Sequence, residues 1–293
     1  MKSGKMKIAI IADIHANKYA LDAVLQDIDK CSVDQIIVNG DLVNRGPGNL
    51  EVLQRLQASG FVFVMGNHDD FIRLWSTRDD QLPAQWFDDP FWAAIDYTVN
   101  EIVDSGFAEF LASLDMDYRI ELPGLPQILI THGSPRHYRD GYAPYAPPEM
   151  FTQVVEKFPA DIYVGSHTHR PWRAERHGKL FLNTGSVGTP FNRNPLAQYL
   201  ILEDVDNDWS FDFRTVEYDQ EAALAEFSSN GFLEHGGLSG FIFHAELKYS
   251  RPIFDPFWRW AEKEKIAKDW RAWEQFIILN PEMLVVPETK KPI

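Results

Sequence analysis

Six short apolar runs, each ending abruptly in polar residues, constrain the fold of this chain more than any other feature. The runs are KIAII, QIIV, FVFVM, QILI, DIYV and KLFL, and the polar residues that follow them extend to Asp13, Asp41, Asp69, Gly133, His169 and Ser186. Runs of this length suit strands that are buried on both faces. Segments 19–30 and 49–59 carry apolar residues at helical spacing between the first three runs. The pattern therefore predicts an α/β fold with parallel strands.

The rest of the chain is predicted to cover and extend this sheet structure. Residues 71–118 are rich in aromatic side chains and are expected to form a mainly helical cover, and residues 133–148 form a long loop. Residues 198–218 predict a hairpin that turns near Asp206 and Asn207. We therefore expect one domain over residues 1–218 and a mainly helical extension, packed on the core, over residues 219–293.

Composition excludes several classes of partner. The chain has 28 basic and 43 acidic residues, a net charge of -15, which opposes binding to duplex nucleic acid. It has one cysteine, Cys31, and therefore no internal disulfide, and its N-terminus lacks the apolar run of a signal peptide. Because no segment reaches the roughly 20 apolar residues that a membrane-spanning helix needs, we expect no membrane partner and a cytoplasmic protein.

Potential metal ligands gather where the predicted strands end. Parallel sheets place their sites in the loops beyond the carboxyl ends of the strands, so these side chains are expected to converge. In the DIH and HTH motifs the polar residues are two positions apart, and in an extended backbone such side chains point the same way. A set of this size is too large for one tetrahedral ion but suits two ions that share a carboxylate. The set consists of Asp13, His15, Asp41, Asn67, His68, His132, His167 and His169.

The order of these motifs carries a family resemblance. D-x-H, G-D-x-x-N-R-G, G-N-H-D, H-G and H-x-H follow one another over about residues 6–215. This order resembles that of the calcineurin-like metallophosphoesterase superfamily. The resemblance implies a four-layer α/β/β/α sandwich and a dinuclear metal centre that hydrolyses phosphate esters by attack of a metal-bridging hydroxide.

The resemblance also implies a role for each matched residue. One ion would be held by Asp13, His15, Asp41 and His169, and the other by Asp41, Asn67, His132 and His167, so that Asp41 bridges the two. His68 would act as a general acid toward the leaving oxygen, with Asp69 orienting its ring. The metals expected for such imidazole-rich sites are manganese, iron, zinc or nickel, and the sequence does not choose among them.

Two positions depart from the usual family pattern, and three are candidate substrate contacts. Asn44 stands where the family usually has an aspartate, and Ser166 stands where it usually has a glycine. Arg45 is a candidate phosphate ligand because its planar guanidinium matches phosphate oxygens, although an arginine beside a Gly-Pro turn is often a surface ion-pair partner. Asn44 and Arg136 are further candidates for the substrate pocket, and for Arg136 a solvated loop position is the alternative.

The sequence leaves several functions open. The segment GDLVNRGPGNLEVL resembles phosphoprotein phosphatases and bacterial dinucleoside tetraphosphatases, whereas THGSPR and LNTGSVGTP resemble a branch of small bacterial phosphodiesterases. The primary prediction is an enzyme that hydrolyses a small phosphodiester or nucleotide. Dinucleoside polyphosphate hydrolysis and phosphoprotein dephosphorylation are the alternatives, and a metal-stabilised scaffold or binding module is the non-enzymatic one. A homo-oligomer is possible in each case.

Overall fold

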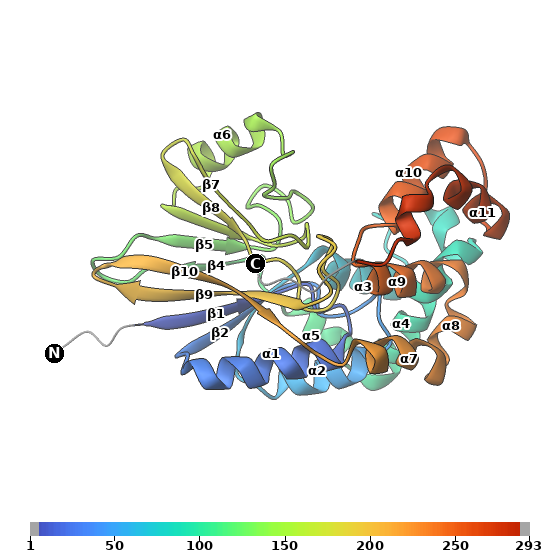
Figure 1. The fold of residues 1–293 in the computed structure, drawn as a ribbon, viewed down its shortest axis with the longest axis horizontal. Coiled ribbons are helices and arrows are strands. Elements are labelled where there is room, and N and C mark those ends of the chain that lie inside the picture. The colour runs from blue at the N-terminus through green and yellow to red at the C-terminus, as the bar shows by residue number, and fades with distance from the viewer. Residues whose placement is uncertain (1–5, 288–293) are drawn as a thin grey trace.

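The computed structural model describes residues 6–287, which form two β-sheets packed face to face. The first sheet contains β1 (Lys7–Ile11), β2 (Gln35–Asn39), β3 (Val62–Val64), β9 (Ala197–Val205) and β10 (Asp208–Val216) in the order β10-β9-β1-β2-β3. The second contains β4 (Asp117–Ile120), β5 (Ile128–Thr131), β6 (Ile162–Gly165), β7 (Trp172–Arg176) and β8 (Lys179–Asn183) in the order β4-β5-β6-β8-β7. Figure 1 shows α1 (Lys18–Cys31) and α2 (Asn49–Gln57) outside the first sheet and α6 (Pro148–Lys157) outside the second. The predicted four-layer sandwich is confirmed.

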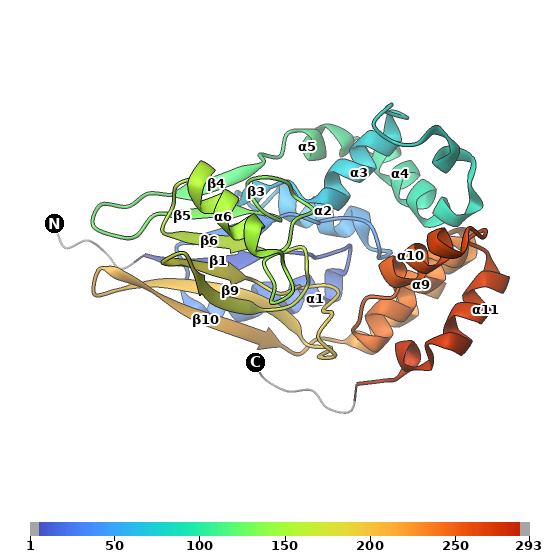
Figure 2. The ribbon, with the colours of Figure 1, turned by 90° about the horizontal axis from the view of Figure 1, so that it is seen from above.

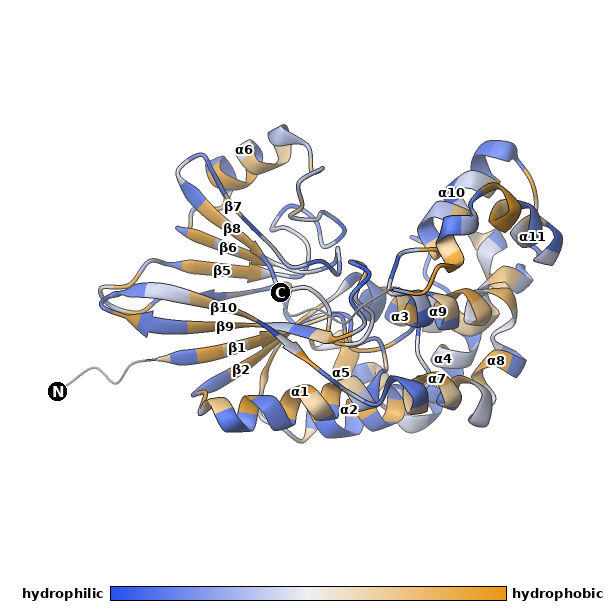
Figure 3. Cartoon of the chain, in the orientation of Figure 1, coloured by the Kyte–Doolittle hydropathy of each residue, from blue (hydrophilic) through white to orange (hydrophobic). Residues whose placement is uncertain are grey.

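Alternation along β1 explains how its sheet buries both faces. Ile8 and Ile10 point into the core between the two sheets, whereas Ala9 and Ile11 belong to the core shared with the outer helices. In Figure 3 the central strands are coloured mostly as hydrophobic, as expected for strands that are buried on both faces. β1, β2 and β3 pair in parallel, as do β5, β6 and β8, so the carboxyl ends within each set lie at one edge. The predicted parallel core is confirmed.

The cover is mainly helical, with two corrections at its ends. It consists of α3 (Asn67–Ser76), two 3-10 turns (Ala84–Asp88 and Pro90–Trp92), α4 (Ala93–Ser105) and α5 (Ala108–Ala112). The cover was expected to run to residue 118, but β4 already begins at Asp117. Asn67 and His68 were expected at the tip of a strand, but they open α3, because β3 ends at Val64 and Gly66 caps the helix.

The predicted hairpin and helical extension are both present. β9 and β10 are joined by Asp206 and Asn207, whose φ values of 56° and 64° suit a tight two-residue turn. The extension contains α7 (Gln220–Ser229), α8 (Phe232–His235), α9 (Gly237–Tyr249), α10 (Phe254–Glu264), α11 (Trp270–Leu279) and a 3-10 turn (Pro281–Leu284). Asp219 caps α7 by accepting a hydrogen bond from the Ala222 amide.

The extension lies against the helical cover, beside the sheets (Figure 2). α9 packs on α4, and one continuous apolar cluster includes Ile95 of α4, Ile242 of α9 and Phe257 of α10. Within residues 6–287, no helix is long and apolar enough to cross a membrane. The division of the chain at residue 218 stays a prediction, and its terminal residues, 1–5 and 288–293, lie outside the described part.

Candidate metal centre

The predicted ligands lie at the carboxyl ends of the central strands of both sheets. Asp13 and His15 follow β1, Asp41 follows β2, His132 follows β5, and His167 and His169 follow β6. The expected extended geometry of the DIH and HTH motifs is wrong. Their ligands have left-handed backbones, with φ values of 52° for Asp13, 48° for His15, 62° for His167 and 56° for His169. Such conformations cost on the order of 1 to 3 kcal/mol each and are typical of functional sites.

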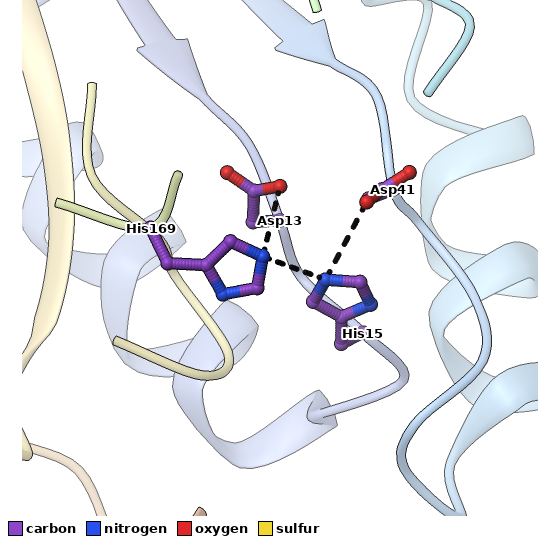
Figure 4. A group of neighbouring side chains, drawn as sticks. All are labelled: Asp13, His15, Asp41 and His169. Carbon is purple, nitrogen blue, oxygen red and sulfur yellow. Dashed lines mark hydrogen bonds and ion pairs between the residues drawn. The ribbon is translucent and has the colours of Figure 1, made fainter. Parts of the chain in front are cut away.

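The first ligand group consists of Asp13, His15, Asp41 and His169, whose ligand atoms all lie within 4.8 Å of one another. Figure 4 shows the two imidazoles turned toward each other, with Asp13 beside His169 and Asp41 beside His15. The Nε2 atoms of His15 and His169 are 3.2 Å apart. His169 Nε2 lies 3.4 Å from Asp13 Oδ1, and His15 Nε2 lies 3.5 Å from Asp41 Oδ2. All four side chains are buried.

The second ligand group shares Asp41 with the first. Ligand atoms of Asp41, His132 and His167 also lie within 4.8 Å of one another. His132 Nε2 is 3.3 Å from Asp41 Oδ2 and 3.2 Å from Asn67 Oδ1, which adds the amide to the group. The structure thus brings all seven predicted ligands together in two groups that meet at Asp41.

Backbone carbonyls orient two of the imidazoles. His132 Nδ1 lies 2.7 Å from the Asn39 carbonyl oxygen, and His169 Nδ1 lies 2.6 Å from that of Thr189. Because each Nδ1–H donates to a carbonyl, each Nε2 is directed at the carboxylates, as a metal ligand requires. The Phe191 ring stacks on His169 with centroids 4.2 Å apart. Asn39, Thr189 and Phe191 were not predicted, and the first two act through backbone carbonyls, which leave no residue-type signal.

Unpartnered buried oxygens test whether the site fits metal ions. Among the described residues, Asp13 Oδ1 and Asp41 Oδ2 are buried and have no hydrogen-bond donor. A buried carboxylate oxygen without a partner costs free energy, and a cation bound among the ligand atoms would supply that partner. Imidazole, carboxylate and amide ligands together suit divalent manganese, iron, zinc or nickel. The residues therefore fit one divalent ion in each group.

The protonation of the ligands reflects the concentration of negative charge. Burial lowers the pKa of His132, but the Asp41 and Asp13 carboxylates outweigh it and raise that pKa to about 10. Burial raises the pKa of Asp13 well above its usual value, whereas for Asp41 the effect of burial is outweighed by His132 and His68, and its pKa falls well below the usual value. Burial lowers the pKa of His15, so its imidazole is neutral and free to bind a cation.

His68 lies beside both groups as the second residue of α3. Its backbone amide donates to Asp41 Oδ1 at 2.7 Å, and its ring meets the His15 ring edge to face at 4.9 Å. Asn44 Nδ2 lies 2.9 Å from His68 Nδ1, and Arg45 Nε lies 3.2 Å from His68 Nε2. Burial lowers the pKa of His68 to about 3; Asp41 opposes this shift, and the charge of Arg45 adds to it.

The expected role of Asp69 is wrong. Its carboxylate accepts hydrogen bonds from the backbone amides of Asp41 at 2.8 Å, Leu42 at 2.9 Å and Gly66 at 2.9 Å, so both oxygens face backbone and not the His68 ring. Asp69 therefore ties the loop after β2 to the start of α3. Gly66 permits this close approach, because an added Cβ would lie 2.1 Å from the Asp41 amide nitrogen.

A cavity of about 940 Å³ opens beside the second ligand group. Asp41, Asn67, His68, His167 and His169 form part of its lining. The other walls come from the cover (Phe71, Trp86 and Trp92), the loop after β5 (Arg136 and Arg139) and the extension (Phe243, Phe254 and Arg259). The long loop at 133–148 is thus part of the site, as its length suggested.

Two of the three predicted substrate contacts line this cavity. Arg136 does so while its Nε lies 3.6 Å from Asp140 Oδ2. Arg45 also lines the cavity. It forms an ion pair with Glu246 of α9, and this pair is buried, whereas the alternative considered for Arg45 was a surface ion pair. Asn44 instead contacts the His68 ring and accepts the Arg45 amide at Oδ1. Glu246 was missed, although a lone acid in the apolar stretch FIFHAEL was a signal.

Ser166, the other departure from the family pattern, has a structural place. It is fully buried, its Oγ accepts from Asn39 Nδ2 at 2.9 Å, and it lies 2.8 Å from Thr184 Oγ1. These bonds join the ends of β2, β6 and β8. The hydroxyl therefore fixes the loop that carries His167 and His169 without reaching the ligand groups.

Comparisons with known proteins support a family assignment. A family model described as calcineurin-like phosphoesterase matches residues 6–171, more than half of the chain. An uncharacterized protein of Methanocaldococcus jannaschii is 27% identical over 77% of this chain and 93% of its own length. A symmetrical bis(5'-nucleosyl)-tetraphosphatase of Erwinia tasmaniensis is 40% identical, but over only 22% of this chain and 24% of that protein.

Solved structures give the same result for the fold. A metallophosphoesterase from Sphaerobacter thermophilus has a TM-score of 0.65 and 26% identity over 84% of this chain and 99% of that one. A hypothetical protein from Pyrococcus horikoshii has a TM-score of 0.63 and 21% identity over 79% of this chain and 99% of its own. With its sandwich, its motif order and its match to the family model, this chain belongs to the calcineurin-like phosphoesterase family.

Proposed function

We propose that this chain is a divalent-metal-dependent phosphoesterase that hydrolyses a small phosphodiester or nucleotide. The observation that carries the proposal is the pair of buried ligand groups that share Asp41 and border a cavity of about 940 Å³. Two divalent ions bound in these groups would lower the pKa of a shared water and neutralise charge on the phosphate oxygens. The family membership supports hydrolysis of a phosphate ester.

In this proposal His68 donates a proton to the leaving oxygen. Asn44 Oδ1 accepts the Arg45 amide at 2.7 Å, so its Nδ2 faces His68 Nδ1 and donates there. Arg45 Nε donates to His68 Nε2 at 3.2 Å, so Nε2 can carry the proton only when Arg45 turns to another acceptor, which a substrate phosphate would provide. The negative phosphate also raises the pKa of His68 from its low value and favours the protonated ring.

The cavity favours dinucleoside polyphosphate hydrolysis as a second candidate. Its volume is in the range that encloses ligands of drug size and far exceeds that of one phosphate group. Arg139 lines it and has no carboxylate partner in residues 6–287, so its charge is available to a further phosphate. Trp86 and Phe254 are partly exposed aromatic residues in its wall, against which a base would pack. The partial match to a tetraphosphatase supports the same candidate.

The test is turnover of bis-p-nitrophenyl phosphate by the purified chain with added Mn²⁺. We expect hydrolysis that depends on the metal and stops when a chelator removes it. A panel of phosphomonoesters, cyclic nucleotides and dinucleoside polyphosphates would then separate the two candidates. Absence of turnover with manganese, iron, zinc and nickel, while ions remain bound, would instead favour the scaffold alternative.

A cytoplasmic location remains a prediction from composition.

A further inference from the structure

The guanidinium of Arg45 is enclosed by the C-terminal extension. Its side chain is only 11% exposed, and its Nη1 donates to Glu246 Oε2. Three aromatic rings lie with centroids between 5.2 and 5.9 Å from Cζ, namely those of Phe191, Phe243 and Phe254. Two of these rings and Glu246 belong to the extension. The extension therefore holds an arginine that lies at the cavity wall and against His68.

The two carboxylate oxygens of Glu246 have different partners. Its side chain is 1% exposed, and Oε1 accepts hydrogen bonds from the Ile253 amide at 2.8 Å and the Phe254 amide at 2.9 Å. A neutral glutamine could accept both of these bonds. Oε2 faces Arg45, so the negative charge of Glu246 serves the arginine and not the turn between α9 and α10. Burying a carboxylate costs free energy unless it is paired, so a purely structural role would be met by a neutral side chain.

We propose that Glu246, by pairing with Arg45 at the cavity wall, makes the site prefer phosphodiesters over phosphomonoesters. This inference rests on the proposed phosphoesterase function. A fixed negative charge beside Arg45 offsets much of the attraction that the arginine exerts on a phosphate. The loss is larger for a phosphomonoester, which carries about two negative charges at pH 8, than for a phosphodiester, which carries one. Glu246 is thus a specificity-determining residue that acts through Arg45 and does not touch the substrate.

The variant Glu246→Gln isolates this charge. Glutamine keeps the size of the side chain and an Oε1 acceptor for the two backbone amides, but it removes the negative charge opposite Arg45. We would measure kcat/KM of the metal-loaded chain at pH 8 for p-nitrophenyl phosphate and bis-p-nitrophenyl phosphate, which share a leaving group. The ratio of monoester to diester should rise about tenfold, which corresponds to about 1.4 kcal/mol.

The matched control is Asp27→Asn, which removes the charge of another ion pair. Asp27 Oδ2 lies 2.9 Å from Arg214 Nε, and neither residue lines the cavity. This variant should leave the ratio unchanged. If Glu246 only supports the fold, Glu246→Gln will lower kcat/KM for both esters by the same factor. An unchanged ratio would therefore overturn the inference.

Two further measurements test the effect of the Glu246 charge. Calorimetric titration of the metal-loaded chain with inorganic phosphate at pH 8 should show about tenfold tighter binding in Glu246→Gln, and equal or weaker binding would contradict the inference. If the natural chain hydrolyses neither ester, the proposed function is refuted, and this titration still decides whether the charge of Glu246 weakens phosphate binding at Arg45. If the variant fails to fold, the natural chain still decides: it should favour the diester at pH 8, and a preference for the monoester would contradict the inference.

Discussion

Asp41 occupies the position on which both ligand groups depend. Its Oδ2 lies 3.5 Å from His15 Nε2 and 3.3 Å from His132 Nε2, while its Oδ1 accepts the His68 amide. It is buried, and its pKa lies well below the usual value, because His132 and His68 outweigh the effect of burial. The carboxylate therefore stays charged over the working pH range and attracts cations from both sides.

Asp41→Asn tests this position. The variant keeps the shape of the side chain but removes the charge that both groups share, so we expect both ions to be lost together. Elemental analysis after dialysis would measure this loss. Asp161→Asn is a suitable control, because Asp161 forms an exposed ion pair with Lys179 and lies outside both groups. Retention of two ions by Asp41→Asn would contradict the bridging assignment.

His68→Ala tests the proton donor. The imidazole lies at the cavity and beside the ligands, but in neither ligand group. We therefore expect the variant to keep its metal and to lose activity toward bis-p-nitrophenyl phosphate on the order of 100-fold or more. Parallel metal analysis and kinetics separate the two effects. Release of metal by this variant would show that His68 is a ligand and that its assigned role is wrong.

Sequence reasoning found the side chains that converge in the two ligand groups, but not the contacts that orient them. Asp13, Asp41 and His132 were predictable because strand-end positions and motif order both select them. The contacts of Asn39 and Thr189 with the imidazoles were not predictable, since they use carbonyl oxygens that every residue has. The left-handed backbone of the DIH and HTH motifs was missed because residue spacing carries no information about φ.

Among the elements, α1 is tied to the first sheet by one charged pair. Asp27 of α1 accepts hydrogen bonds from Arg214 of β10 at 2.9 Å and from the Tyr199 hydroxyl of β9 at 2.8 Å. Burial raises the pKa of Asp27, but these two donors outweigh it and hold that pKa below its usual value of 3.8. The pair therefore joins the outer helix to the sheet most strongly when Asp27 is ionised.

The depressed pKa of Asp27 predicts how its stabilising effect depends on pH. A group whose pKa is lower in the folded state stabilises the fold above its unfolded pKa, and this effect is lost as the pH falls through the folded value. Asp27→Asn should therefore lower the free energy of unfolding by about 1 to 2 kcal/mol at pH 7, and the difference should shrink as the pH falls below 3.8, the usual pKa of the group. Urea unfolding at pH 7 and at the lowest pH at which the chain stays folded would measure it. An equal difference at both pH values would contradict this account.

The edge strands of the second sheet, β4 and β7, show where sequence reasoning misses an element. The buried strands β1, β2, β5, β6 and β8 were predictable from their continuous apolar runs. β7 was not predicted, because its sequence WRAER is mostly polar and lies at a sheet edge. β4 was hidden for the same reason, since three of its four residues are not fully buried.

At the scale of the whole molecule, the extension, the cover and the outer face of the first sheet share one apolar cluster. Phe257 of α10 is fully buried, and its ring lies 5.9 Å from that of Phe91 in the cover and 5.6 Å from that of Trp273 in α11. The same cluster continues to Ile11 in β1. We therefore expect the described part of the chain to unfold in one transition, and the cavity walls to lose their shape if the extension detaches.

Phe257→Ala tests this shared core. Removing a fully buried phenylalanine should lower the free energy of unfolding by about 3 to 5 kcal/mol. Ile278→Ala is a matched control in the same extension, because Ile278 is 77% exposed and should change stability by less than about 0.5 kcal/mol. Thermal unfolding followed by circular dichroism would compare them. A second, separate transition in the natural chain would show that the extension is an independent unit.

The number of divalent ions bound per chain tests the central claim most directly. Equilibrium dialysis of the purified chain against Mn²⁺, followed by elemental analysis, should find two ions per chain, because two ligand groups share Asp41. Binding of no ion, or of a single ion at saturation, would contradict the account.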